Sequence, residues 1–346
     1  MRMLIRFELR KIWTKRLAMA AMLMLFLLDG SILLNLGERD IKGEQQEAAR
    51  YAGELDDEKV QRMLEDYLPT QERLDMLRGI SVGDVTFSPM QSAVHSRFAD
   101  AQGRWNGKTV SQVFGTARIE VGYNAGWLRF SRQMIKLGVA LLIAAMILTA
   151  PVFAGEYDGM ESLILSSRCG RTRCVLAKAS AALMVTTGMT AALLAVNAAA
   201  ALALYGMQGL DADVLFCPLE FEHYMKRSIS CAQMLSWQAG LMLCGVFAAT
   251  GVTLLVSALS RNVVSALVLS MLALLFPVFL SCSVKTPAGQ ALALMPVGLI
   301  QFSELMSVGN DTPILAMAAV PISAAVGALA SCLGCRCFAK RQKCGA

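Results

Sequence analysis

The chain has 346 residues, of which 55% are hydrophobic and 17% are charged, and its formal net charge is +6. Soluble globular proteins carry about 25% charged residues, whereas here the charges lie in clusters between long apolar runs. About 20 apolar residues cross the hydrocarbon core of a bilayer as a helix. These features exclude an ordinary soluble protein and predict an all-α integral membrane protein; the alternating pattern of a membrane barrel is absent.

The first sixteen residues predict an amphipathic helix that lies in the membrane interface. An apolar row and a basic row recur at helical spacing, formed by Ile5, Leu9, Ile12 and Trp13 and by Arg2, Arg6 and Arg10. Residues 17–36 predict the first span. A secretory signal is the alternative, but Asp29 follows the apolar run without a small-residue cleavage site, which favours an uncleaved anchor.

Residues 37–132 form the one sizeable polar segment, and helical spacing of its apolar residues predicts a small helical domain outside the membrane. Within it, Ser88 followed by Pro89 predicts a helix start. The run Trp105-Asn-Gly-Lys predicts a turn.

Five further spans are predicted, at residues 134–154, 176–206, 235–259, 263–283 and 312–334. They are separated by a loop at 155–175, an outer loop at 207–234 and an outer segment at 284–311, and are followed by a basic tail at 335–346. In the outer segment, the apolar stretch 288–302 is broken by Pro296 and Gly298. It predicts a re-entrant or interfacial helical pair that does not span.

The distribution of charge predicts the orientation of the six spans. With both termini in the cytoplasm, the cytoplasmic pieces hold 15 of the 32 Lys and Arg residues and 4 of the 26 acidic residues. That side carries a net charge of +11, and the remainder carries −5. Short cytoplasmic loops are rich in Lys and Arg. The basic segments therefore indicate contact with membrane lipid, and no motif that reads nucleic acid is present.

Two features leave alternatives open. A stripe of small residues, Ser323, Gly327 and Ser331, lets helices approach closely, either within one subunit or between two. Cys217 and Cys231 share one outer loop, where a disulfide and two free thiols are both compatible with the sequence.

The sequence carries no motif for catalysis, for a cofactor or for a metal site. The P-loop, zinc-protease, nucleophile-elbow and dinucleotide patterns are absent. Asp29 is the clearest charge within a span and Asn197 the main buried amide, so both are candidates for lining a substrate path. For Asp29, a carboxylate that packs helices together or lies near the membrane interface is the alternative and the favoured interpretation.

The layout is that of a translocator without an energy source of its own. It resembles the permease subunits of bacterial ABC-2-type ATP-binding cassette exporters. Three features carry the resemblance: the leader Phe7-Glu-Leu-Arg-Lys-Ile-Trp13, the order of the elements, and the stretch from Phe153 through Glu156 to the run Leu163-x-Leu-Ser-Ser-Arg168-x-Gly-Arg171, with Lys178 opening the third span.

The resemblance implies a multi-pass protein of the bacterial cell membrane that binds a separate ATPase subunit and a second permease. It implies that the loop after the second span forms a coupling helix that docks into the ATPase. The residues assigned to this coupling are Glu156, Met160, Leu163, Ile164, Arg168, Arg171 and Lys178. Glu156 is expected to tie that helix to the third span through Arg171 or Lys178.

Two other classes compete with this interpretation. A membrane sensor or immunity protein would bind a ligand with the domain at 37–132. A secondary transporter is disfavoured because charged residues are scarce within the spans and because no duplicated half is visible.

Overall fold

The fold is described from a computed structural model, which describes residues 2–37, 40–67, 88–100, 103–156, 173–218, 228–276, 286–301 and 313–340. The chain is mostly helical and forms two compact units. One unit holds residues 1–35, 133–199 and 237–346, and the other holds residues 36–132 and 200–236. We call the first the helix bundle and the second, after the predicted outer domain that it contains, the outer unit.

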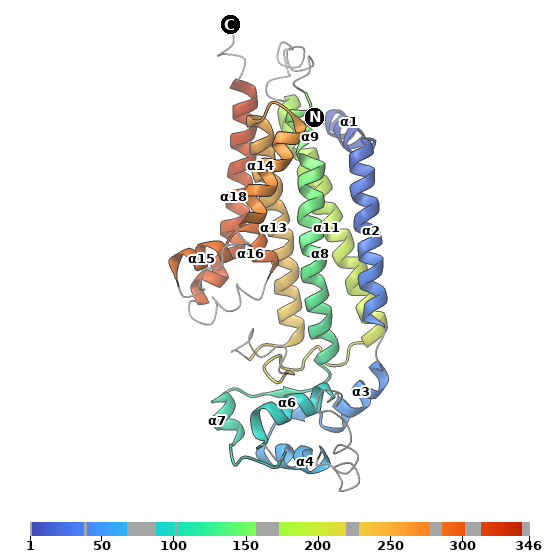
Figure 1. Cartoon of the computed structure of the whole chain (residues 1–346), viewed down its shortest axis with the longest axis vertical. Coiled ribbons are helices and arrows are strands. Elements are labelled where there is room, and N and C mark those ends of the chain that lie inside the picture. The colour runs from blue at the N-terminus through green and yellow to red at the C-terminus, as the bar shows by residue number, and fades with distance from the viewer. Residues whose placement is uncertain are drawn as a thin grey trace, which may run out of the picture. The chain divides into compact units, whose positions relative to one another are not determined.

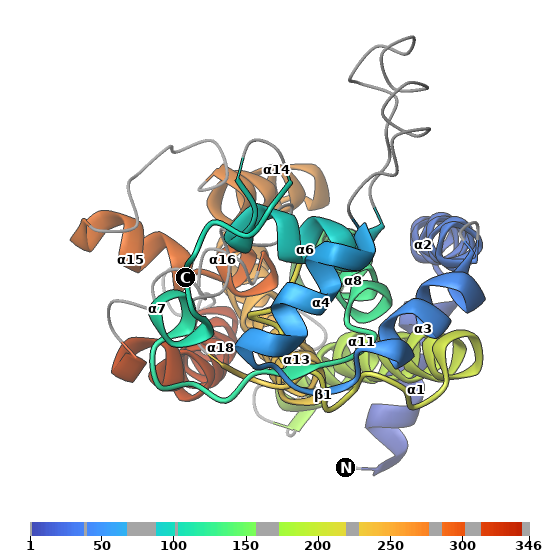
Figure 2. The same ribbon diagram turned by 90° about the horizontal axis from the view of Figure 1, so that it is seen from below.

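Within the described residues, five helices are long and apolar enough to cross a membrane, which supports a multi-pass membrane protein. They run beside one another in Figure 1 and comprise α2 (Arg16–Leu36), α8 (Ala125–Thr149) with its short continuation α9 (Pro151–Ala154), α11 (Val175–Tyr205), α13 (Cys231–Leu259) and α18 (Pro313–Lys340). Both views place α2 beside α11 (Figures 1 and 2). The C-terminal ends of four predicted spans agree with the observed helices within one residue. The helices of the second and fourth spans begin nine and four residues earlier than predicted, and α18 continues six residues past 334.

The predicted fifth span, 263–283, is described only in part. Its first half forms α14 (Val263–Leu275), an apolar helix of 13 residues that is too short to cross a bilayer by itself. Residues 277–283 lie outside the described part of the chain, so a sixth span stays a prediction.

The apolar stretch at 288–302 forms two short helices, as its proline and glycine predict. These are α15 (Pro287–Ala293) and α16 (Pro296–Ile300), each with proline in its first turn. The side chain of Thr286 accepts a hydrogen bond from the N–H of Gly289 and so caps α15. Neither helix has the length to span.

The first segment of the outer unit is largely helical, as expected. It contains α3 (Ile41–Arg50), α4 (Asp57–Tyr67), α6 (Pro89–Phe98) and α7 (Val110–Phe114). The predicted start of α6 is confirmed, because the side chain of Ser88 accepts a hydrogen bond from the N–H of Gln91. An antiparallel pair of two-residue strands, β1 (Gly53–Glu54) and β2 (Glu120–Val121), is a small departure from the all-α prediction.

The second segment of the outer unit, residues 200–236, contains the predicted outer loop at 207–234, and hydrogen bonds join it to the first segment. The N–H of Asp213 donates to the carbonyl of Glu120 at 2.8 Å, and the guanidinium of Arg97 donates to the carbonyl of Cys217 at 2.8 Å. Cys217 and Cys231 are both buried, and the structure shows no disulfide between them. The outer unit is therefore built from two stretches of chain.

The small-residue stripe packs α18 against α13 within the bundle. A Cβ atom built on Gly251 would lie 2.3 Å from the carbonyl oxygen of Gly327, and one built on Gly327 would lie 2.9 Å from Cα of Ala248. Glycine at both positions lets the two backbones approach closely. The stripe therefore serves packing inside one subunit.

Gly251→Ala should destabilise the protein by about 1–3 kcal/mol, because the added methyl group overpacks a backbone contact. Gly188→Ala on α11 is the matched control, since nothing lies within 4 Å of its Cβ position. The control should be neutral or stabilising by up to about 1 kcal/mol. Thermal unfolding in detergent compares the two variants, and equal melting temperatures would contradict the close packing of α13 against α18.

Candidate functional site

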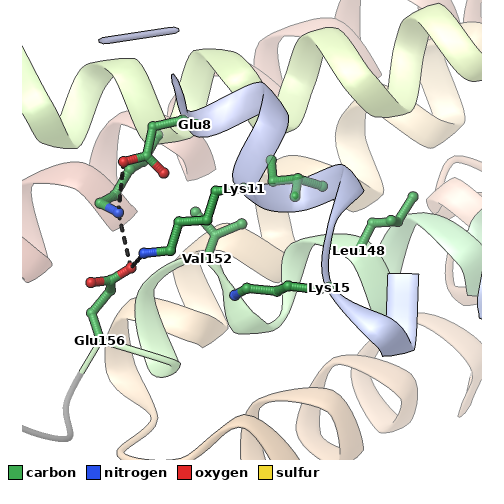
Figure 3. A pocket seen from close by; sticks show the side chains of 8 residues that line it. Glu8, Lys11, Lys15, Leu148, Val152 and Glu156 are labelled. Atoms are coloured by element: carbon green, nitrogen blue, oxygen red, sulfur yellow. Dashed lines mark hydrogen bonds and ion pairs between the residues drawn. The ribbon is translucent and has the colours of Figure 1, made fainter. Parts of the chain in front are cut away.

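Five charged side chains meet at one end of the bundle, and we call them the charge cluster: Glu8, Lys11, Lys15, Glu156 and Lys178. Glu8 and Lys11 lie on α1 (Arg2–Trp13), Lys15 follows that helix, Glu156 follows α9 and Lys178 lies in the first turn of α11. Figure 3 shows Lys11 and Lys15 reaching toward the side of the cluster on which Glu156 lies. The cluster therefore joins the leader helix to the ends of two long helices.

Lys178 is the centre of the cluster. Its Nζ lies 3.0 Å from Oε1 of Glu8 and 3.0 Å from Oε1 of Glu156, and its side chain is only 2% exposed. A buried ammonium group needs such partners, because its loss of hydration is costly unless it is paired. Since the two carboxylates come from different elements, the charge of Lys178 holds α1 and the end of α9 to α11.

Glu156 is shared between two lysines. Its Oε1 accepts hydrogen bonds from Nζ of Lys11 and of Lys178. Burial by itself would raise the pKa of the Glu156 carboxyl, but the hydrogen bond from Lys11 and the charge of Lys178 outweigh burial and lower that pKa from its ordinary value. Glu156 is therefore ionised at neutral pH.

With three lysines and two glutamates, the charge cluster has a net charge of +1, and Lys15 is the lysine without a carboxylate partner among the described residues. Its Nζ donates to the carbonyl of Pro151 at 3.4 Å, and in the described ranges no carboxylate lies within ion-pair distance of it. Burial and the neighbouring Lys11 lower the pKa of Lys15. The space among these side chains is about 10 Å³, room for about one water molecule. The cluster is therefore packed closely and does not form a pocket for a small molecule.

Ser257 on α13 fixes the position of Glu156. Its hydroxyl donates to the carbonyl of Ala150 at 2.7 Å and accepts from the N–H groups of Phe153 and Ala154 at 3.1 and 3.0 Å. Proline 151 interrupts the helix at this point, because it lacks an N–H group. The serine bridges the interrupted hydrogen-bond ladder, so the last turn before Glu156 depends on α13.

The structure brings together two of the residues assigned to coupling. Glu156 pairs with Lys178, one of the two partners considered for it. Met160, Leu163, Ile164, Arg168 and Arg171 lie at 157–172, outside the described residues. Glu8 and Lys11 were not predicted as site residues. The available signal was Glu8 itself, the one carboxylate among six basic residues in the leader.

The structure also brings together the two residues proposed for a substrate path. Nδ2 of Asn197 on α11 donates to Oδ1 of Asp29 on α2 at 2.6 Å, and both residues are buried. Their contact with each other favours the helix-packing interpretation of Asp29.

Within the described residues, no cluster of histidine, cysteine, aspartate or glutamate has the arrangement of a metal site. Comparisons with protein-family models, curated proteins and solved structures find no match to this chain. The function therefore has to be inferred from the sequence and from the charge cluster.

Lys178→Met should destabilise the protein by about 3–5 kcal/mol, because it leaves two buried carboxylates without their central cation. Arg62→Met is the control, since Arg62 forms an exposed pair with Glu58 on α4 and its loss should cost less than about 1 kcal/mol. Thermal or denaturant unfolding of both variants tests this. Equal losses would show that the cluster does not hold the bundle together.

The pH dependence of stability provides a test of Glu156. Because its pKa is lowered in the folded protein, its contribution is present above the ordinary value of 4.5 and is lost as the pH falls through the lower folded value. The melting temperatures of the wild type and Glu156→Gln should therefore differ most near pH 7 and converge below pH 4.5. A difference that stays constant from pH 7 to pH 3 would contradict the ion pairing.

Proposed function

We propose that this protein is the membrane-spanning permease subunit of a bacterial ABC-type exporter, driven by a separate ATPase subunit. The observation that carries the proposal is the charge cluster. Glu156 and Lys178 lie near the two ends of the predicted coupling loop at 155–175, and they form an ion pair with each other. The leader helix α1 is attached to the same two residues, because Lys11 pairs with Glu156 and Glu8 pairs with Lys178.

This arrangement suits a protein that receives mechanical work. A force applied to the segment 157–172 or to α1 reaches the ends of α9 and α11 through short, buried ion pairs. Ser257 carries it further, to α13. Helices connected in this way move as bodies, which is how domain motion opens and closes a path between them. The permease itself contributes shape and differential contacts, and the ATPase contributes the chemistry.

The same elements support the membrane environment, the second permease and the cytoplasmic termini that we propose. Arg6 and Arg10 on α1 are exposed, as expected for a helix that contacts anionic headgroups at the cytoplasmic face of the cell membrane. A second permease, identical or related, would complete the path. Both termini would lie in the cytoplasm, in keeping with the distribution of Lys and Arg.

A membrane sensor is the second candidate, and one feature of the outer unit favours it. An open cavity of about 450 Å³ lies between α3 and α4 and is lined by Glu47, Arg50, Tyr51, Asp66 and Tyr67, among others. The hydroxyl of Tyr51 donates to Asp66 at 2.7 Å, and burial together with this bond raises the pKa of Tyr51 to about 12. Such a polar cavity suits a small polar ligand.

Leu163→Asp tests the permease proposal directly. It should abolish co-purification with the separate ATPase subunit that the proposal requires, because it places a charge in the apolar contact expected between the coupling helix and the ATPase. Residue 163 lies outside the predicted spans, so membrane insertion should be unchanged.

The matched control is Ser162→Asp, which adds the same charge to the opposite side of the expected helix. The control should retain co-purification and ATP hydrolysis in liposomes. If Leu163→Asp retains both as well, the coupling role is wrong and the sensor becomes the better proposal.

A further inference from the structure

The cavity between α3 and α4 of the outer unit carries charges of both signs. Its volume, about 450 Å³, is that of a small-molecule site, for which about 300–1,000 Å³ is usual. Glu47 and Arg50 line the cavity from α3, and Asp66 lines it from α4. The cavity therefore offers a ligand two carboxylates and one guanidinium group.

Two hydrogen bonds that run in opposite directions hold the walls of the cavity together. The hydroxyl of Tyr67 on α4 donates to Oε1 of Glu47 on α3. The hydroxyl of Tyr51, at the end of α3, donates to Oδ2 of Asp66 on α4 at 2.7 Å. The centroids of the two tyrosine rings lie 6.1 Å apart. The two carboxylates are thus held in place in the absence of a ligand, which reduces the entropy lost on binding.

Each of the two carboxylates keeps one oxygen for a ligand. Glu47 accepts hydrogen bonds from Tyr67 and Ser88, both at Oε1. Asp66 accepts one from Tyr51 at Oδ2. No donor within the described ranges reaches Oε2 of Glu47 or Oδ1 of Asp66. All three donors are hydroxyl groups, which are neutral and leave the charge of a carboxylate uncompensated.

The guanidinium group of Arg50 lines the same cavity without pairing with these carboxylates. No ion pair in the described part of the chain includes Arg50, Glu47 or Asp66. All three groups nevertheless act on one hydroxyl. Burial and the hydrogen bond to Asp66 raise the pKa of Tyr51 to about 12. The charge of Arg50 acts to lower that pKa, and the charge of Glu47 acts to raise it. A ligand in the cavity therefore meets both signs of charge at once.

A ligand that matches these charges carries two cationic groups and one carboxylate. We propose that the cavity binds a basic amino acid such as L-lysine. The carboxylate of the ligand pairs with Arg50, and its two ammonium groups pair with Glu47 and Asp66. Charge-assisted contacts of this kind are stronger than those between neutral groups. The inference names the ligand of the cavity on which the sensor candidate rests, and it holds or fails independently of the permease proposal.

Isothermal titration calorimetry of the full-length chain in detergent, at neutral pH, tests this with three related probes. L-lysine has all three charges, L-norleucine lacks the side-chain ammonium group, and cadaverine lacks the carboxylate. L-lysine should bind more tightly than either of the others by about tenfold, because each of them loses one charge-assisted contact. Absence of L-lysine binding, or equal affinity for the three probes, would overturn the proposal.

Two variants separate contact with the ligand from a structural effect. Arg50→Gln should weaken the binding of L-lysine by about tenfold, because the carboxylate loses its partner. The same variant should strengthen the binding of cadaverine, because a like charge is removed from the cavity. Asp66→Asn, whose amide oxygen can still accept from Tyr51, should weaken the binding of both probes. An affinity for L-lysine that either variant leaves unchanged contradicts the assignment, as does a change in the same direction for both probes in Arg50→Gln.

Arg62→Gln is the matched control, because Arg62 lies on the same helix α4 in an exposed pair with Glu58 and does not line the cavity. It should change neither affinity, and a loss as large as that in Arg50→Gln would show a general effect of charge instead of a site. No ATPase takes part in these measurements. A negative result therefore leaves the permease proposal standing, and the outcome of Leu163→Asp does not bear on this site.

Discussion

A buried positive charge must be matched where it lies, and Lys178 imposes this constraint on one end of the bundle. Its side chain is removed from water at the start of α11, so carboxylates have to be brought to it from elsewhere in the chain. Glu8 comes from the leader helix and Glu156 from the end of α9. The positions of α1 and of the segment after α9 are therefore consequences of satisfying one ammonium group.

The same end of the bundle depends on a second constraint, the missing N–H group of Pro151. A helix interrupted there leaves backbone groups that need new partners inside an apolar environment. The hydroxyl of Ser257 serves as both donor and acceptor for them. A serine on α13 thus determines the direction in which the chain leaves α9, and with it whether Glu156 reaches Lys178.

Hydropathy was sufficient to predict most of the long helices, because burial in lipid requires continuous apolar runs of fixed length. The division of residues 288–302 into two short helices was also predicted correctly, because Pro296 and Gly298 interrupt a helix at their own positions. The ion pair of Glu8 with Lys178 was not predictable in this way. The two residues are far apart in sequence. Helical periodicity predicts which face of a helix a residue occupies, but it does not predict which residue of another helix that side chain contacts. Glu156 was predicted as a site residue from the resemblance to known permeases. Its contact with Lys11 is shown only by the structure.

The outer unit shows a related limit of sequence reasoning, because its two stretches of chain meet through hydrogen bonds to backbone carbonyl groups, which have no sequence signature. Residues 200–236 are held to the first stretch by the bonds of Asp213 to Glu120 and of Arg97 to Cys217. An excised fragment comprising only residues 36–132 would therefore lack the segment that carries the buried side chains of Val214 and Phe216. Producing the outer unit as a soluble protein requires both stretches, joined by a linker in place of the helices that connect them.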